Sequence, residues 1–191
     1  MIKNYLWSVM LLLIMLSVSC TQKQKNIPKP PTYLRVELPA KTYETYRDDC
    51  GYEFLSPNYF KVGSVAPNNC NRDIVFTGLN GALHLSVIEM DTNLSAYVDY
   101  AIDKVDEHKI KATAIHDYTI QSEDGTFGGT LFELQGNVAS PFQFYTTDSL
   151  NHFIGGVVYF NTRPNYDSIR PVLDFVKEDL EKFMESIRWV K

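Results

Sequence analysis

The sequence has little positive charge, few cysteines and few long apolar runs. Its 191 residues contain 18 Lys and Arg against 23 Asp and Glu, which gives a formal net charge of −5. Non-specific nucleic-acid binding depends on a basic surface, so this composition argues against nucleic-acid partners. Beyond residue 20 no apolar run approaches the roughly 20 residues that a membrane-spanning helix requires. The first 20 residues are therefore the segment to examine for membrane association.

The sequence also lacks the common catalytic and metal-binding motifs. It contains no HExxH, GxSxG, P-loop or GxGxxG pattern. The four histidines show no ligand spacing; they are His84, His108, His116 and His152. Gly128-Gly129 indicates a bulge or bend in a strand rather than a phosphate-binding loop. We therefore predict no enzymatic activity, no metal site and no cofactor, although an active site without a known motif stays open at this stage.

What is present begins with an export signal. Leu6–Cys20 is an apolar run of about 11 to 13 residues closed by small residues and a cysteine, too short to span a bilayer and typical of a secretory signal. Ser19-Cys20 completes a lipobox pattern. We predict a lipoprotein signal peptide over residues 1–19 and lipidation of Cys20 by diacylglycerol and palmitate. Multiple acyl chains give stable anchoring. The alternative is a buried cysteine in an uncleaved helix.

A polar, proline-rich segment follows the predicted lipid site. Thr21–Pro31 reads TQKQKNIPKPP, and proline favours extended polyproline geometry, so residues 20–32 are predicted to be the lipidated cysteine and its linker. The lysines of this segment can face anionic headgroups; they are Lys23, Lys25 and Lys29. A plain solvated linker is the equal alternative. Residues 33–191 are then predicted to form one domain.

Two cysteines remain once Cys20 is assigned to lipid. An even remainder in an exported domain favours a disulfide between Cys50 and Cys70, and two free thiols are the alternative. Closing this loop of about 21 residues is worth about 3 kcal/mol in the chain-entropy model.

Alternating apolar residues and turn signals predict many short strands and two helices. The predicted strands are Tyr33–Leu38, Tyr52–Leu55, Phe60–Val62, Asp73–Thr77, Ala82–Glu89, Ala114–Ser122, Thr130–Leu134, Phe142–Thr147 and His152–Asn161. One helix is predicted from Asn93, its N-cap, through Val105. A second is predicted over residues 168–187 with Ser168 as its cap, and 188–190 follow as a tail or closing strand. Helices do not alternate with single strands, so the fold class is α+β with an antiparallel sheet. With YEFLSPNYF in its sheet, a helix at NLSAYVDYA and a last helix that ends in ESIRW, the chain resembles the Mog1/PsbP sandwich.

Several motifs together resemble the GldD family of gliding-motility lipoproteins. They are the lipobox, Pro28-Lys29-Pro30-Pro31 leading into Tyr33-Leu34-Arg35-Val36 and Leu38-Pro39, then Tyr43, Cys50-Gly51-Tyr52-Glu53-Phe54, and the Lys177-Glu178-Asp179 helix that ends in Ile187-Arg188-Trp189. The resemblance implies an accessory lipoprotein of the gliding machinery and of the type IX secretion system linked to it. It implies no catalytic residues, and Cys20 is the one functional residue that carries over.

The working hypothesis is a non-catalytic assembly or stabilising factor in the cell envelope, with its domain in the periplasm. Its partners would be the membrane and other gliding or secretion proteins. Tyr43 and Tyr46 are candidate interface residues because tyrosine is enriched at interfaces. The alternative is that they pack on their own sheet. The competing hypothesis is a ligand-binding module that holds a pigment, lipid or peptide in a cleft of the sandwich.

Overall fold

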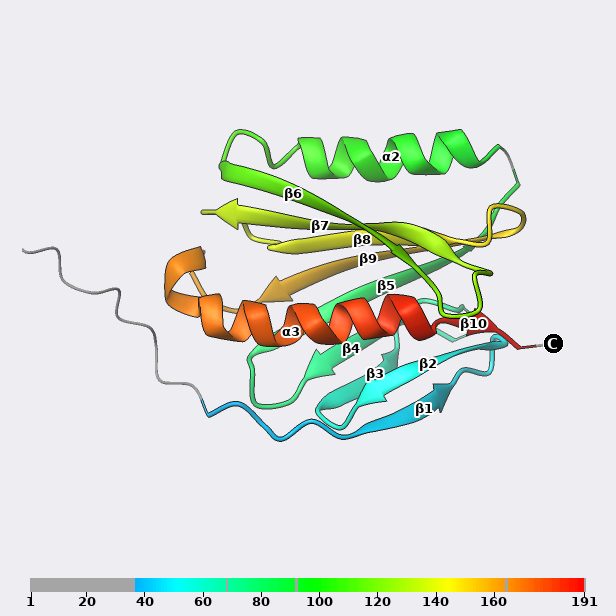
Figure 1. Ribbon diagram of the computed structural model, residues 1–191, viewed down its shortest axis with the longest axis horizontal. Helices are drawn as coiled ribbons and strands as arrows, with labels where there is room; N and C mark the ends of the chain where they lie inside the picture. The colour runs from blue at the N-terminus through cyan, green and yellow to red at the C-terminus, as the bar shows by residue number, and fades with distance from the viewer. Residues whose placement is uncertain (1–36, 68, 92, 164, 191) are drawn as a thin grey trace, which may run out of the picture. The chain divides into compact units, whose positions relative to one another are not determined.

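A computed structural model describes residues 37–67, 69–91, 93–163 and 165–190 (Figure 1). The predicted signal, Cys20, the linker and residues 33–36 of the first predicted strand lie outside the described residues. Glu37 and Leu38 belong to no regular element, so the prediction of a strand that reaches Leu38 is wrong for these two residues. The physical reason is the register, because Tyr43 already pairs with Pro57 at the end of the neighbouring strand.

Ten strands and two helices are assigned in the described residues, and every strand pair is antiparallel. The strands are β1 (Tyr43–Arg47), β2 (Tyr52–Pro57), β3 (Phe60–Ser64), β4 (Arg72–Phe76), β5 (Gly81–Glu89), β6 (Ala112–Gln121), β7 (Gly128–Gly136), β8 (Phe142–Thr147), β9 (His152–Phe160) and β10 (Arg188–Trp189). The helices are α2 (Leu94–Asp106) and α3 (Tyr166–Ser186). The strands form a seven-stranded sheet in the order β3-β4-β5-β9-β8-β7-β6 and a three-stranded sheet in the order β1-β2-β10. This arrangement is the predicted α+β class.

The two helices cover opposite faces of the seven-stranded sheet. Along β7, Leu131 packs into the larger core beneath α3, whereas Leu134 packs with Val105 of α2 in a smaller one. The alternation follows from the period of two along a strand. In Figure 1, α2 and α3 accordingly lie on either side of β6–β9. The larger core holds most of the buried aromatic side chains, so α3 is the more firmly packed helix.

Helix α3 joins the two sheets. The ring centroid of Phe183 on this helix lies 4.5 Å from that of Phe54 on β2 and 5.6 Å from that of Phe144 on β8, with the ring planes tilted to one another. The apolar stripe of this helix is buried from Val172 to Phe183, but the predicted cap Ser168 is wrong. Asn165 caps α3, because its side-chain oxygen accepts a hydrogen bond from the amide of Ser168, which lies in the first turn.

Helix α2 packs more loosely. Asn93 caps it as predicted and accepts a hydrogen bond from the amide of Ala96. Of the residues of this helix, Val105 alone is buried. Among the described residues, no helix combines the length and the apolar character needed to cross a membrane.

Candidate functional site

A wide groove of about 880 Å³ lies between α2 and the outer face of the seven-stranded sheet. The helix stands off the sheet here, and Tyr100 is 63% exposed at the rim. Aromatic and aliphatic side chains form most of the lining, which includes Tyr97, Tyr100, Phe132, Phe153, Val157 and Tyr159. A concave, mostly apolar site with few polar groups is what small-molecule ligands use.

Small residues on the central strands leave the floor of this groove open. Gly155 of β9 would place a Cβ in ordinary contact with Phe153, 3.9 Å away, and with nothing closer. Ser86 of β5 pairs with Gly155 and also lines the groove. The sheet therefore presents a shallow depression beneath α2.

The polar groups of the groove lie at its edges and have partners within the protein. The ring of His84 bonds through Nδ1 to the carboxylate of Asp73 and lies 5.4 Å from the ring of Tyr159. At the other edge, Gln143 donates to Ser140, whose hydroxyl is bonded to His108. The geometry suits an apolar ligand that places a polar end at either edge.

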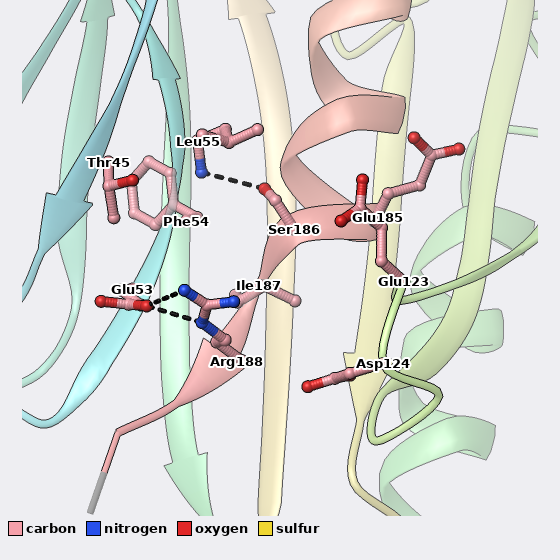
Figure 2. A pocket seen from close by; sticks show the side chains of 10 residues that line it. All are labelled: Thr45, Glu53, Phe54, Leu55, Glu123, Asp124, Glu185, Ser186, Ile187 and Arg188. Atoms are coloured by element: carbon pink, nitrogen blue, oxygen red, sulfur yellow. Dashed lines mark hydrogen bonds and ion pairs between the residues drawn. The ribbon is translucent and has the colours of Figure 1, made fainter.

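A second, smaller cavity of about 410 Å³ lies where β2, the end of α3 and the β6–β7 turn meet (Figure 2). Figure 2 shows Arg188 paired with Glu53, and the amide of Leu55 donating to the hydroxyl of Ser186. Hydrogen bonds from Arg47 and Arg188 lower the pKa of Glu53. This carboxylate therefore stays ionised and serves to hold β10 beside β2.

Three further carboxylates border the smaller cavity: Glu123, Asp124 and Glu185. Hydrogen bonds from Thr126 and Ser122 lower the pKa of Asp124 to about 2, so it cannot act as a proton donor near neutral pH. In the described part of the chain, no group of three or more His, Cys, Asp or Glu side chains is arranged to hold a metal ion. The cavity is polar and acidic but presents no recognisable catalytic pair.

The structure brings together two of the site residues that were predicted from the sequence. Cys50 and Cys70 form a disulfide, the pairing that the sequence favoured. It lies beside a buried ion pair in which Arg72 donates to both oxygens of Asp48. The disulfide thus closes the end of the three-stranded sheet onto β4.

Tyr43 and Tyr46 both lie on β1 and contact their own fold. Tyr43 reaches α3, where its hydroxyl donates to Asp179, and Tyr46 packs 5.1 Å from the ring of Phe54 and donates to Asp48. Their role in an interface stays a prediction. Cys20 lies outside the described residues, so its lipidation also stays a prediction.

Two buried carboxylates escaped the analysis of the sequence. Glu133 on β7 lies between Phe132 and Leu134, and Asp179 on α3 lies in the charged run KEDLEK, so nothing in the local sequence marks either carboxylate as buried. Glu133 accepts hydrogen bonds from Tyr166, Lys177 and Tyr118. Although burial opposes ionisation, the hydrogen bonds from Tyr166, Lys177 and Gln135 bring the pKa of Glu133 down to about 2. Both carboxylates hold α3 in place.

The comparison with protein families decides the identity of the chain. The family model of the gliding motility lipoprotein GldD matches residues 23–189. The chain belongs to the GldD family of gliding motility lipoproteins. The resemblance seen in the sequence is therefore confirmed, and membership of GldD makes the protein a gliding motility lipoprotein. No curated protein matches the chain by sequence.

Solved structures confirm the fold class. The crystal structure of the Saccharomyces cerevisiae Ran-binding protein Mog1p matches with a TM-score of 0.50 at 11% identity, over 80% of this chain and 97% of that one. A mutant of protein Mog1 matches with a TM-score of 0.52 at 12% identity, over 78% of this chain and 97% of that one. At this identity the likeness concerns the fold alone.

Proposed function

We propose that this GldD-family protein is a non-catalytic accessory factor that assembles or stabilises the gliding machinery and the linked type IX secretion system. Residues 1–19 are removed as a signal peptide, Cys20 carries the lipid, residues 20–32 form the spacer and residues 33–191 form the periplasmic domain. Other envelope lipoproteins or membrane proteins of this machinery are its partners, and no nucleic acid is among them.

One observation carries this proposal: the match to the GldD family over residues 23–189. It extends from the linker through all the described strands and helices, so the whole domain is shared with gliding lipoproteins. The core supports a structural role, because the buried carboxylates of Asp179 and Glu133 accept hydrogen bonds from side chains of the protein itself.

The anchor is tested by replacing the cysteine. Cells grown with labelled palmitate should label the wild-type protein and the control variant Ser19→Ala, which keeps a small residue before Cys20. The Cys20→Ala variant should be unlabelled and the cells that carry it should glide poorly. An unlabelled wild-type protein would overturn the anchor, and full motility of Cys20→Ala cells would make the anchor dispensable.

The assembly role is tested by capture from native membranes. The tagged wild-type protein should recover gliding or secretion components, and cells without the protein should contain less of those same components. A capture that recovers none of them, with the protein itself intact and membrane-bound, would contradict the proposal.

The groove favours a second function, that of a ligand-binding module. An apolar molecule such as a pigment or lipid tail would lie over Gly155 beneath α2. The probe anilinonaphthalene sulfonate should bind with saturable fluorescence, and Gly155→Leu should abolish that signal by filling the depression. The control Thr119→Leu, on the exposed side of β6, should bind like wild type. Equal fluorescence from all three proteins would rule out the groove as the ligand site.

A further inference from the structure

The antiparallel topology gathers the connecting loops at two ends of the seven-stranded sheet, and these ends differ in charge. One end, here called the basic end, holds the β2–β3, β4–β5, α2–β6, β7–β8 and β9–α3 connections. Its charged residues are Glu107, Lys109, Lys111 and Arg163. The other end, here called the acidic end, holds the β1–β2, β3–β4, β5–α2, β6–β7 and β8–β9 connections. Its charged residues are Asp48, Asp49, Asp91, Glu123, Asp124 and Asp148.

Ion pairs within the protein neutralise only part of the charge at each end. At the acidic end Arg72 neutralises Asp48. At the basic end Lys109 lies 2.6 Å from Asp106, so Lys111 and Arg163 supply most of the uncompensated positive charge. The contrast in sign between the ends therefore remains.

The most exposed aliphatic side chain of each end lies in a loop. Ile110, in the α2–β6 loop at the basic end, is 94% exposed and lies between Lys109 and Lys111. Leu150, in the β8–β9 turn at the acidic end, is 77% exposed and follows Asp148 and Ser149. An apolar tip between two lysines suits the boundary between acyl chains and anionic headgroups, and an apolar tip beside a carboxylate does not.

The described chain begins at the basic end. Ala40 accepts a hydrogen bond from the side chain of Asn58 in the β2–β3 turn, and in Figure 1 the described chain starts on the left, the same side as the α2–β6 loop. From Cys20 to Glu37 the chain covers at most about 3.5 Å per residue, or roughly 60 Å. A lipid on Cys20 therefore lies within reach of the basic end.

We infer that the α2–β6 loop is a membrane-contact site for anionic lipid. Ile110 enters the interface, Lys111 and Lys109 meet the headgroups, and the acidic end faces away from the bilayer. In the cell this inference rests on the proposed anchor at Cys20, which brings the domain to a membrane. The loop then gives the anchored domain a fixed orientation, which a flexible tether alone does not supply.

The test uses the mature chain with Cys20→Ser, so that its outcome is independent of lipidation. Ile110→Trp and Leu150→Trp are matched reporters at the two ends, and each is compared with the parent chain to subtract Trp189. With phosphatidylglycerol vesicles, Ile110→Trp should shift its emission to the blue and be quenched by brominated lipid. Leu150→Trp should do neither, and phosphatidylcholine vesicles should affect neither variant.

A second variant pair measures the charge. Lys111→Glu should lower vesicle co-sedimentation several-fold, and the control Lys61→Glu on β3 should lower it little. Equal shifts for the two tryptophans would overturn the inference. So would vesicle binding in which neither tryptophan shifts, since the basic linker would then be the sole contact. Failure of the anchor itself would appear separately, in palmitate labelling.

Discussion

The hydroxyl of Tyr43 on β1 donates a hydrogen bond of 2.5 Å to Asp179, a carboxylate of α3 with no exposed surface. Tyr59 donates to the same carboxylate, and Lys41 lies 3.2 Å from it. Burial and the bond to Asp179 raise the pKa of Tyr43 to about 12, so its hydroxyl remains a donor at any physiological pH. The edge strand is thereby fastened to the helix.

Removing this hydroxyl should weaken the fold. Tyr43→Phe takes one of three partners from a buried carboxylate, which should lower the free energy of unfolding by about 1–2 kcal/mol. Urea unfolding measures the change, and the control Tyr100→Phe, at an exposed position of α2, should leave stability unaltered. If the Tyr43→Phe protein were fully stable but no longer captured its partner proteins, Tyr43 would instead belong to a protein interface.

The disulfide should be a main contributor to stability. Loss of the Cys50–Cys70 bridge, which spans a sequence separation of 20, should cost about 3 kcal/mol. Reducing agent should therefore lower the urea midpoint of wild-type protein and leave the double variant Cys50→Ala/Cys70→Ala unchanged. The Cys20→Ser chain should respond like wild type. An identical midpoint for wild-type protein with and without reductant would contradict this expectation.

Acid should destabilise the protein partly through Glu133. Its pKa in the folded state is about 2, below the ordinary value of 4.5, so the folded state binds this proton less readily than the unfolded chain. The resulting stabilisation is complete above pH 4.5 and is lost as the pH falls toward 2, up to about 3 kcal/mol in all. Unfolding measured at several pH values should show a flatter slope for Glu133→Gln. The exposed control Glu44→Gln should keep the wild-type slope, and parallel curves for all three proteins would disprove the role of Glu133.

Adjacent glycines on β9 should respond oppositely to the same substitution. A Cβ on Gly155 meets an open groove, whereas a Cβ on Gly156 would overlap the ring of Phe144 in the larger core. Gly155→Ala should therefore be neutral or slightly stabilising, and Gly156→Ala should cost about 1–3 kcal/mol through overpacking. Thermal unfolding of the two variants provides the comparison. Equal destabilisation would show that Gly155 is not at an open surface.

Much of the fold was predictable from local pattern. The β8–β9 hairpin and the stripe of α3 follow from alternation and from the helical period, which are properties of neighbouring residues. Strand β1 was missed because Tyr43–Arg47 is short and mostly exposed, and it becomes a strand through pairing with β2. The sequence predicts a bulge or bend at Gly128-Gly129, and the regular pairing with β8 excludes the bulge. Gly129 instead lets the backbone of Tyr145 approach closely.

The candidate site was less predictable because it depends on tertiary placement. The sequence predicts the helix itself, but not that α2 meets the sheet firmly at Val105 and stands away from it near Tyr100. The distance between a helix and a sheet is set by side chains that arrive from β7, β8 and β9, so no local pattern reveals the groove. The Cys50–Cys70 pair was predictable from the sequence because a disulfide can form only between cysteines.

The last strand, β10, pairs with β2, and Trp189 lies opposite Tyr52. Almost the whole sequence of the domain separates these two paired residues. The three-stranded sheet therefore cannot be completed until the final residues are available. A chain that leaves the cytoplasm from its N-terminus would remain without its finished core throughout translocation. Such long-range closure slows folding, and a chain that folds slowly stays unfolded for export, so the order of the strands fits the signal peptide proposed for residues 1–19.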